Sequence, residues 1–155
     1  MLESYQAKHP TPFAVLGIRT VGDLLTDIEY LPPGVATLAP LTRLAERVCC
    51  QIDRYLEDPG YAFDVPFDYV GTPFQCRVWR QISAIPVGRT MRYGDIALRL
   101  RTAPRPVGRA CGDNRMPIII PCHRVVGATG LGGFMHSRGG LPLEIKKWLL
   151  RHEGV

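Results

Sequence analysis

Residues 71–75 read Gly-Thr-Pro-Phe-Gln, and at this point the chain changes character. Thr72 suits the N-cap of a helix because its hydroxyl can accept a backbone N–H, and Pro73 suits the first helical position, where no hydrogen bond is lost. Apolar residues then follow at helical spacing. We therefore expect one domain over residues 1–70 and a second over residues 71–155.

The second domain is expected to be mainly helical. Apolar spacing and proline positions predict helices over residues 93–100, 104–111 and 143–152, the last with Ile145, Trp148 and Leu149 facing inward. The first two are short and joined by a brief turn, which favours a helix-turn-helix. Residues 116–126 read as an extended apolar segment, and residues 127–140 as a glycine-rich loop.

The first domain mixes strand and helix signals. Short apolar runs between turn residues predict strands over residues 13–18 and 24–31. An apolar stripe that begins at Leu41 predicts a helix over residues 41–56. Residues 63–68 contain a proline and read as an extended edge or linker.

Composition excludes several protein classes. A chain of 155 residues that is 46% hydrophobic can pack a core, but no apolar run approaches the roughly 18 residues of a membrane span. The sequence does not begin with a secretory pattern, so we expect a cytoplasmic protein with no membrane partner. Its five cysteines show no Cys-x-x-Cys pair and no metal-ligand spacing. We therefore expect neither a disulfide framework nor a metal.

The net charge of +5 hides an asymmetry. Residues 1–70 carry five Lys and Arg against ten Asp and Glu, whereas residues 71–155 carry fourteen against four. So basic a C-terminal half suits a polyanion, and DNA or RNA is the first candidate. A solvated basic surface without a ligand is the alternative.

Residues 121–125 read Pro-Cys-His-Arg-Val and carry the clearest chemical signal. Cysteine attacks as the thiolate, and the imidazole and guanidinium beside Cys122 are groups that lower a thiol pKa. The alternative is a buried, inert cysteine. Because adjacent side chains on an extended chain point in opposite directions, His123 is not expected to touch Cys122 directly.

Together these motifs resemble the O6-alkylguanine-DNA alkyltransferases, also called methylated-DNA–protein-cysteine methyltransferases. The resemblance covers the whole C-terminal half in order and approximate spacing, and rests on residues 71–75, 85–88, 92–97, 105–110, 114, 120–126 and 148–154. The N-terminal half agrees only in its size, its acidity and a helix before the linker.

The resemblance implies an α/β fold in two parts. A small N-terminal α/β domain with a short antiparallel, ribonuclease H-like sheet would precede a helical domain with the helix-turn-helix. The implied function is DNA repair by irreversible transfer of an alkyl group from O6-alkylguanine, and from O4-alkylthymine as a further candidate, after base flipping. The implied partner is double-stranded DNA with alkylated bases, bound by a monomer without a cofactor. A bacterial member would be nucleoid-associated.

The resemblance also assigns the reaction to particular residues. Cys122 would accept the alkyl group, and a water would link it to His123, which Glu153 would orient. Asn114 would brace the active-site turn. Tyr93 would donate a hydrogen bond to the leaving guanine and crowd the 3′ phosphate. The pocket would include Pro117, Arg124 and Val125.

DNA contacts are implied for the segment around residues 104–111. Arg105 would fill the space that the flipped base leaves, and Arg109 would contact a phosphate. Gly108 and Ala110 are small enough to let the helix lie close to the minor-groove floor. Arg92 is a further candidate phosphate contact.

The loop over residues 131–140 departs from the family pattern. Phe134 stands where most members have a tyrosine, and about five extra residues follow it. Stacking on the flipped base would survive, but a hydroxyl contact would be lost, unless Ser137 supplies it. The tolerance of bulky adducts is expected to differ, because this loop would line the pocket.

Three other functions compete with alkyl transfer. A non-enzymatic protein that binds alkylated DNA would lack a reactive cysteine, which argues against it. A Cys-His hydrolase would not explain the arginine-rich half. A transcriptional regulator would need sequence-specific binding.

Overall fold

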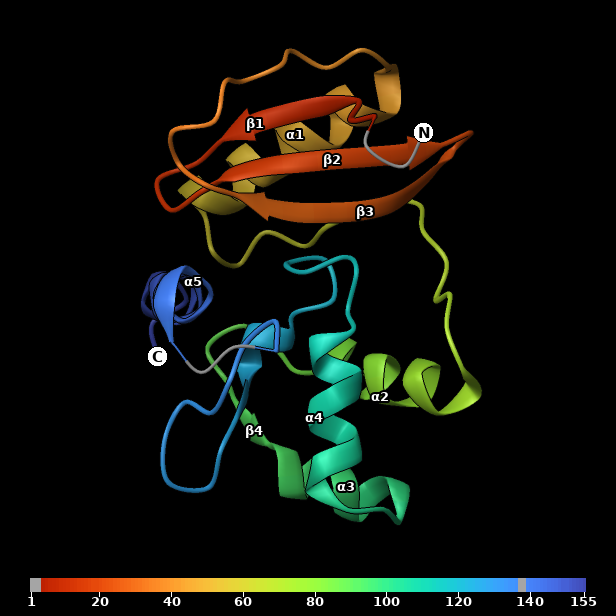
Figure 1. Ribbon diagram of the computed structural model, residues 1–155, viewed down its shortest axis with the longest axis vertical. Helices are drawn as coiled ribbons and strands as arrows, with labels where there is room; N and C mark the ends of the chain where they lie inside the picture. Colours follow the sequence, from red (N-terminus) through yellow and green to blue (C-terminus); the bar gives the residue numbers. More distant parts are fainter. Residues whose placement is uncertain (1–3, 137–138) are drawn as a thin grey trace. The chain divides into compact units, whose positions relative to one another are not determined.

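The structure, a computed structural model, describes residues 4–136 and 139–155 (Figure 1). The chain divides into two compact units, residues 1–68 and residues 69–155. The first unit holds a small antiparallel sheet and an α-helix, and the second holds several helices and a pair of very short strands. The chain is therefore mixed α/β.

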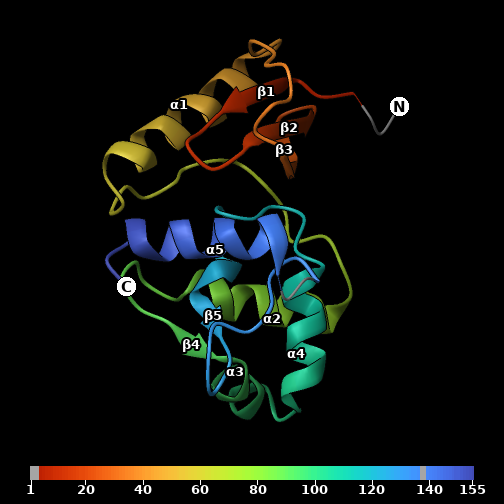
Figure 2. The same ribbon diagram turned by 60° about the vertical axis from the view of Figure 1, so that its left-hand side comes forward.

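The first unit is a three-stranded antiparallel sheet with a helix along one face (Figure 2). Its elements are β1 (Ala7–Pro10), β2 (Val15–Val21), β3 (Leu24–Leu31) and α1 (Arg43–Glu57). The expected strand over residues 24–31 is confirmed, whereas the strand expected over residues 13–18 begins and ends later. β1 was not predicted, because it is short and consists mostly of polar residues and proline, which give no strand pattern.

α1 begins where its cap is satisfied. Thr42 Oγ1 accepts a hydrogen bond from the backbone N–H of Ala45 at 3.1 Å, which satisfies one of the free donors at a helix start. Val48 and Ile52 on the inner face are fully buried. The expected start at Leu41 is wrong, because that residue precedes the cap and is 67% exposed.

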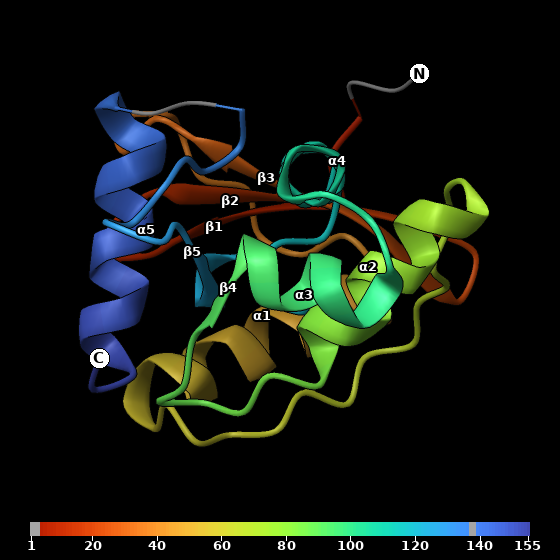
Figure 3. The same ribbon diagram turned by 90° about the horizontal axis from the view of Figure 1, so that it is seen from below.

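The second unit is mainly helical. Its elements are α2 (Pro73–Ser83), β4 (Met91–Arg92), α3 (Tyr93–Leu100), α4 (Pro104–Gly112), the 3-10 turn η1 (Cys122–Arg124), β5 (Val125–Val126) and α5 (Gly140–His152). β4 and β5 pair side by side in parallel (Figure 3). The helix expected over residues 93–100 has those bounds, and the one expected over residues 104–111 is one residue longer.

α2 starts as its sequence predicts. Thr72 is the N-cap and Pro73 opens the helix. A reciprocal pair of hydrogen bonds closes the start: the Gln75 backbone N–H donates to Thr72 Oγ1 at 3.1 Å, and the Thr72 backbone N–H donates to Gln75 Oε1 at 2.9 Å. This capping box satisfies two backbone donors at once.

The extended segment expected over residues 116–126 is wrong around the cysteine. Only Val125 and Val126 form a strand, and Cys122 opens η1. Two backbone bonds close this turn: Cys122 N–H donates to the Ile120 carbonyl at 2.8 Å, and Arg124 N–H donates to the Pro121 carbonyl at 2.9 Å. Apolar composition predicted burial correctly but could not show that the backbone turns.

α5 begins at Gly140, three residues before the expected start, and its inward face differs from the expected one. Ile145 and Leu149 are buried, but Trp148 is half-buried and stacks on His152, with ring centroids 4.9 Å apart. Lys146 is fully buried instead. The apolar face of α5 therefore includes one charged side chain.

Within residues 4–136 and 139–155, none of the helices has the length and apolar character of a membrane span. No group of three or more His, Cys, Asp or Glu side chains in the same residues could hold a metal ion.

We predict that Thr72→Ala lowers the free energy of unfolding by about 1 kcal/mol, because the substitution removes the hydroxyl of the capping box. Urea unfolding followed by circular dichroism measures this change. Thr37→Ala, at an exposed threonine in the first unit, is the control and should change stability little. An equal loss in both variants would contradict the prediction.

Candidate active site

A cavity of about 750 Å³ lies in the second unit. α4 forms one wall and the loop after β5 forms another, and the thiol-bearing Cys122 and the ring of Tyr93 complete the lining. The loop contributes Gly127, Thr129, Gly130, Gly132, Gly133, Phe134, Met135 and His136. This cavity brings together the cysteine expected to react, the helix expected to bind DNA and the atypical loop.

Cys122 is a buried thiol on the cavity wall, only 2% exposed. Burial raises its pKa to about 11, although a hydrogen bond from the Asn114 side chain and the nearby Lys146 ammonium act in the opposite direction. The sulfur is therefore protonated at neutral pH. Proximity to His123 and Arg124 in sequence does not make Cys122 a resting thiolate.

His123 is held by a buried carboxylate. Its Nε2 lies 2.8 Å from Glu153 Oε2, and both side chains are essentially inaccessible. Because an ionised carboxylate only accepts hydrogen bonds, Nε2 carries the proton and Nδ1 presents a lone pair. Nδ1 is buried and has no hydrogen-bond partner among the described residues. Burial also lowers the pKa of His123, so the ring is a neutral potential base.

Arg124 braces the same carboxylate. Its Nε donates to Glu153 Oε1 at 2.8 Å and its Nη2 to Oε2 at 3.0 Å, while Nη1 donates to the Ile85 carbonyl at 2.7 Å. The planar guanidinium suits this two-point contact. Its charge also opposes protonation of His123. Arg124 thus fixes the position of the Glu153 carboxylate and offsets its negative charge. Arg124 was expected in the pocket but does not line the cavity.

Asn114 joins the ends of the segment that leads to Cys122. Its Nδ2 donates to the Ile120 carbonyl at 2.8 Å, and its Oδ1 accepts from the Met116 backbone N–H at 2.9 Å. The side chain is buried, so each of these bonds satisfies a group that has no access to water. Asn114 therefore sets the course of the chain into η1.

Tyr93 is the first residue of α3 and faces the cavity. Its hydroxyl donates to the Gly133 carbonyl at 3.2 Å. Gly132 packs against the ring at positive φ, and a Cβ at that position would lie 2.9 Å from the ring. The tyrosine thus contacts the cavity loop directly.

Lys146 is a site residue that the sequence analysis missed. Its Nζ donates to the carbonyls of Val125, Leu131 and Gly133 at 2.7, 2.6 and 2.9 Å. Burial lowers its pKa to about 8, although nearby Cys122 and Cys111 act in the opposite direction. The ammonium holds the loop through these three carbonyls and interacts electrostatically with the sulfur of Cys122. The sequence did contain a signal for this role, because Lys146 lies among the apolar residues of the last helix, where a charged side chain needs a partner.

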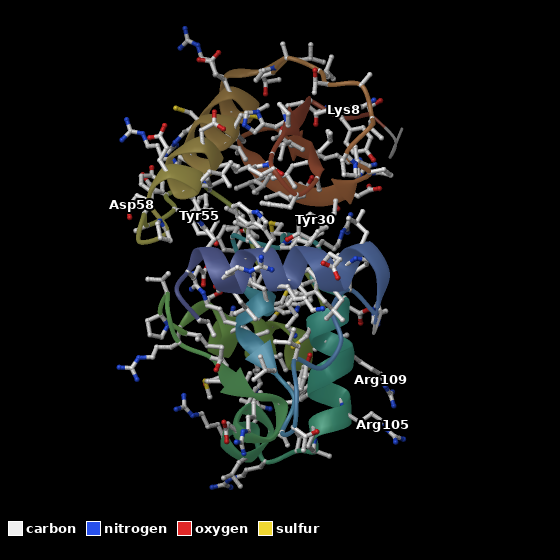
Figure 4. The ribbon with its side chains drawn as sticks, turned by 90° about the vertical axis from the view of Figure 1, so that its left-hand side faces the viewer. Lys8, Tyr30, Tyr55, Asp58, Arg105 and Arg109 are labelled. Atoms are coloured by element: carbon white, nitrogen blue, oxygen red, sulfur yellow. The ribbon has the colours of Figure 1, made fainter. Side chains whose placement is uncertain are left out.

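α4 carries the expected DNA-binding residues. The side chains of Arg105 and Arg109 extend from the same side of the helix into solvent (Figure 4), and both line the cavity mouth with Gly108. Ala110 differs, because it is buried and its carbonyl accepts a hydrogen bond from Trp79 Nε1 at 2.8 Å. Ala110 therefore packs α4 onto α2. Arg92 is exposed at the N-cap of α3.

The expected pocket residues are only partly brought together. Phe134 lines the cavity and is buried. Pro117 and Val125 do not line it: the first lies in a bridge to Ile120, and the second is in β5 with its side chain in the core. Ser137 lies outside the described residues. Cys111, Met135 and His136 line the cavity without having been expected.

We predict that iodoacetamide at pH 7.5 modifies Cys50 well before Cys122. Cys50 is exposed, whereas Cys122 is buried with its pKa raised to about 11, and thiolates are the species that react. Peptide mass spectrometry after timed labelling gives both rates, and unfolding in urea should abolish the difference. Faster labelling of Cys122 would show a resting thiolate and contradict this description.

The chain is similar to several known proteins. The family model for the DNA-binding domain of 6-O-methylguanine DNA methyltransferase matches residues 73–155. The methylated-DNA–protein-cysteine methyltransferase of Candida albicans is 32% identical over 151 residues, covering 92% of this chain and 83% of the relative. The enzyme of the same name from Archaeoglobus fulgidus is 42% identical over 106 residues, 68% and 72% of the two chains.

Similarity also extends to solved structures. The crystal structure of Mycobacterium tuberculosis OGT in complex with DNA matches with a TM-score of 0.78 and 34% identity, over 94% of this chain and 90% of that one. The match therefore includes both units and not only the motif-rich half. On these grounds the chain belongs to the methylated-DNA–protein-cysteine methyltransferase family.

Proposed function

We propose that this protein repairs DNA by moving an alkyl group from O6 of guanine to the sulfur of Cys122, once per molecule. The observation that carries the proposal is the arrangement of a thiol on a cavity wall next to a neutral imidazole, whose free nitrogen is Nδ1 and whose other nitrogen is held by Glu153. O4-alkylthymine is a second candidate substrate. A cofactor has no part in this transfer.

The first step is loss of the thiol proton. Because the pKa of Cys122 is raised to about 11, few molecules hold a thiolate at neutral pH, and a base must take the proton as the reaction proceeds. His123 Nδ1 would accept it through one water. Glu153 then stabilises the imidazolium, in the nucleophile–base–orienter arrangement.

The second step is displacement at the alkyl carbon. The sulfur forms a bond to that carbon, the carbon–O6 bond breaks, and its electron pair stays on guanine. A hydrogen bond from the Tyr93 hydroxyl would stabilise the charge that develops on the base, and the proton lost by the thiol balances the one that guanine gains. The thioether is stable, so Cys122 is not regenerated.

DNA binding would use α3 and α4 as a helix-turn-helix. α4 carries Arg105 and Arg109 at the cavity mouth, so a helix in the minor groove would bring the cavity to an extruded base. Base flipping costs a few kcal/mol, and Arg105 would offset part of this by filling the vacated stack. Arg92 and Arg109 would hold phosphates, as sequence-independent repair requires.

Several finer points belong to the same proposal. The protein would act as a monomer, in the cytoplasm or on a bacterial nucleoid, and its three-stranded sheet would belong to a ribonuclease H-like domain. Binding of alkylated DNA without transfer is less favoured, because it gives no role to a thiol on the cavity wall that is followed in sequence by a buried neutral imidazole.

We predict that duplex DNA with labelled O6-methylguanine transfers at most one label per protein, to Cys122. Cys122→Ser should abolish transfer, because hydroxyl is a far weaker nucleophile at this pH. Cys111→Ser is the matched control, since Cys111 lines the same cavity, and it should retain transfer. Peptide mass spectrometry locates the label. Transfer by the Cys122 variant, or many turnovers, would rule the mechanism out.

We also predict an unusual pH dependence. Burial lowers the pKa of His123 below its ordinary 6.5, so the base stays neutral, and the single-turnover rate stays constant, as pH falls through 6.5. The rate should decline only at lower pH, as the imidazole gains a proton. In His123→Asn the rate should instead rise about tenfold per pH unit from 7 to 10, because it then follows the thiolate fraction. Parallel profiles for the two proteins would contradict the role of His123.

A further inference from the structure

A turn with unusual backbone angles forms one edge of the cavity. Met135 and His136 have φ of 53° and 62°, in the left-handed region that residues with a side chain seldom adopt. Both residues line the cavity. Such a conformation persists only where surrounding contacts hold it. The contacts of Met135 and His136 therefore show which parts of the second unit stabilise the turn.

His136 is fastened to the end of α4. Its Nε2 lies 2.9 Å from Asp113 Oδ1, and the other carboxylate oxygen, Oδ2, accepts a hydrogen bond from Gln75 Nε2 at 3.1 Å. Gln75 is itself fixed by the capping box at the start of α2. We call His136, Asp113 and Gln75 the clasp.

Gly112 leaves room for the clasp. A Cβ at this position would lie no farther than 2.8 Å from three atoms of the His136 ring, closer than real Cβ atoms approach other atoms. The imidazole therefore rests on bare backbone at the last turn of α4. Any larger residue at this position would push the ring away.

The part of the loop that precedes this turn is held by residues of α3 and α5. The Gly133 carbonyl accepts hydrogen bonds from Lys146 Nζ at 2.9 Å and from the Tyr93 hydroxyl at 3.2 Å, and Phe134 is buried. The segment over residues 133–136 is thus anchored at both ends. Between its anchors it forms part of the wall of the cavity that contains Cys122.

We propose that His136 is a specificity-determining residue that limits the size of the alkyl group transferred to Cys122. This inference rests on the proposed function. The clasp holds residues 134–136 near α4 and so restricts the space available to a bulky group. The side chains of His136 and Asp113 are 56% and 46% exposed, and a hydrogen-bonded pair this exposed is weak. The clasp therefore slows the transfer of bulky alkyl groups but does not prevent it.

The test compares two substrates in the same duplex, one with O6-methylguanine and one with O6-benzylguanine. Single-turnover rates are measured for the wild type, His136→Ala, Gly112→Ala and the double variant. Each single variant should raise the benzyl-to-methyl rate ratio by about two- to fivefold, the range expected for loss of one exposed side-chain pair. The double variant should match the singles, because both substitutions release the same clasp.

His9→Ala is the matched control. His9 Nε2 forms the same kind of pair, 2.6 Å from Asp53 Oδ1, in the first unit, and its loss should leave the ratio unchanged. A constant ratio in both single variants, even if all rates fall together, would reduce the clasp to a structural contact and overturn the inference. A wild type that transfers neither group would overturn the proposed function as well.

Discussion

The carboxylate of Glu153 is the contact on which the site depends. It accepts hydrogen bonds from His123 and from two nitrogens of Arg124, at 2.8 to 3.0 Å, without exposure to solvent. A buried charge is tolerated only when it is paired in this way. Glu153 is also the C-cap of α5, where the helix dipole disfavours an acid. Its cationic partner offsets that cost and ties the end of α5 to the turn that carries Cys122.

Burial keeps the thiol of Cys122 and the imidazole of His123 uncharged at rest. It raises the pKa of Cys122 to about 11 and lowers that of His123, so neither is ionised at neutral pH. In the proposed mechanism, reactivity therefore depends on the placement of the His123 ring, whose Nε2 is held by Glu153 and whose Nδ1 is left without a partner among the described residues. It does not depend on a thiolate that is present at rest. For an acceptor that reacts only once, a resting thiol has a clear advantage, because stray electrophiles react with thiolates.

Local rules predicted the start of α2 and the bounds of α3 and α4 well, but not the start or the inward face of α5. The Thr72 and Pro73 start of α2 and the bounds of α3 follow from capping and apolar spacing, which involve only near neighbours. The burial of Lys146 did not follow, because it depends on carbonyls that are distant in sequence. The turn at Cys122 did not follow either, because side-chain hydrogen bonds from Asn114 fix it and apolar composition does not reveal them. Pairing of His123 with Glu153 came from family resemblance, since a carboxylate thirty positions away has no local signature.

The most direct test of the central claim uses free O6-benzylguanine, which needs no DNA contact to enter the cavity. Intact and peptide mass spectrometry, with guanine release measured in parallel, should show one benzyl group in place of the Cys122 thiol hydrogen, none on Cys111, and one guanine released for each modified protein. Guanine released beyond one equivalent, or benzyl found on Cys111 with Cys122 unmodified, would contradict the assignment of Cys122 as a single-use acceptor.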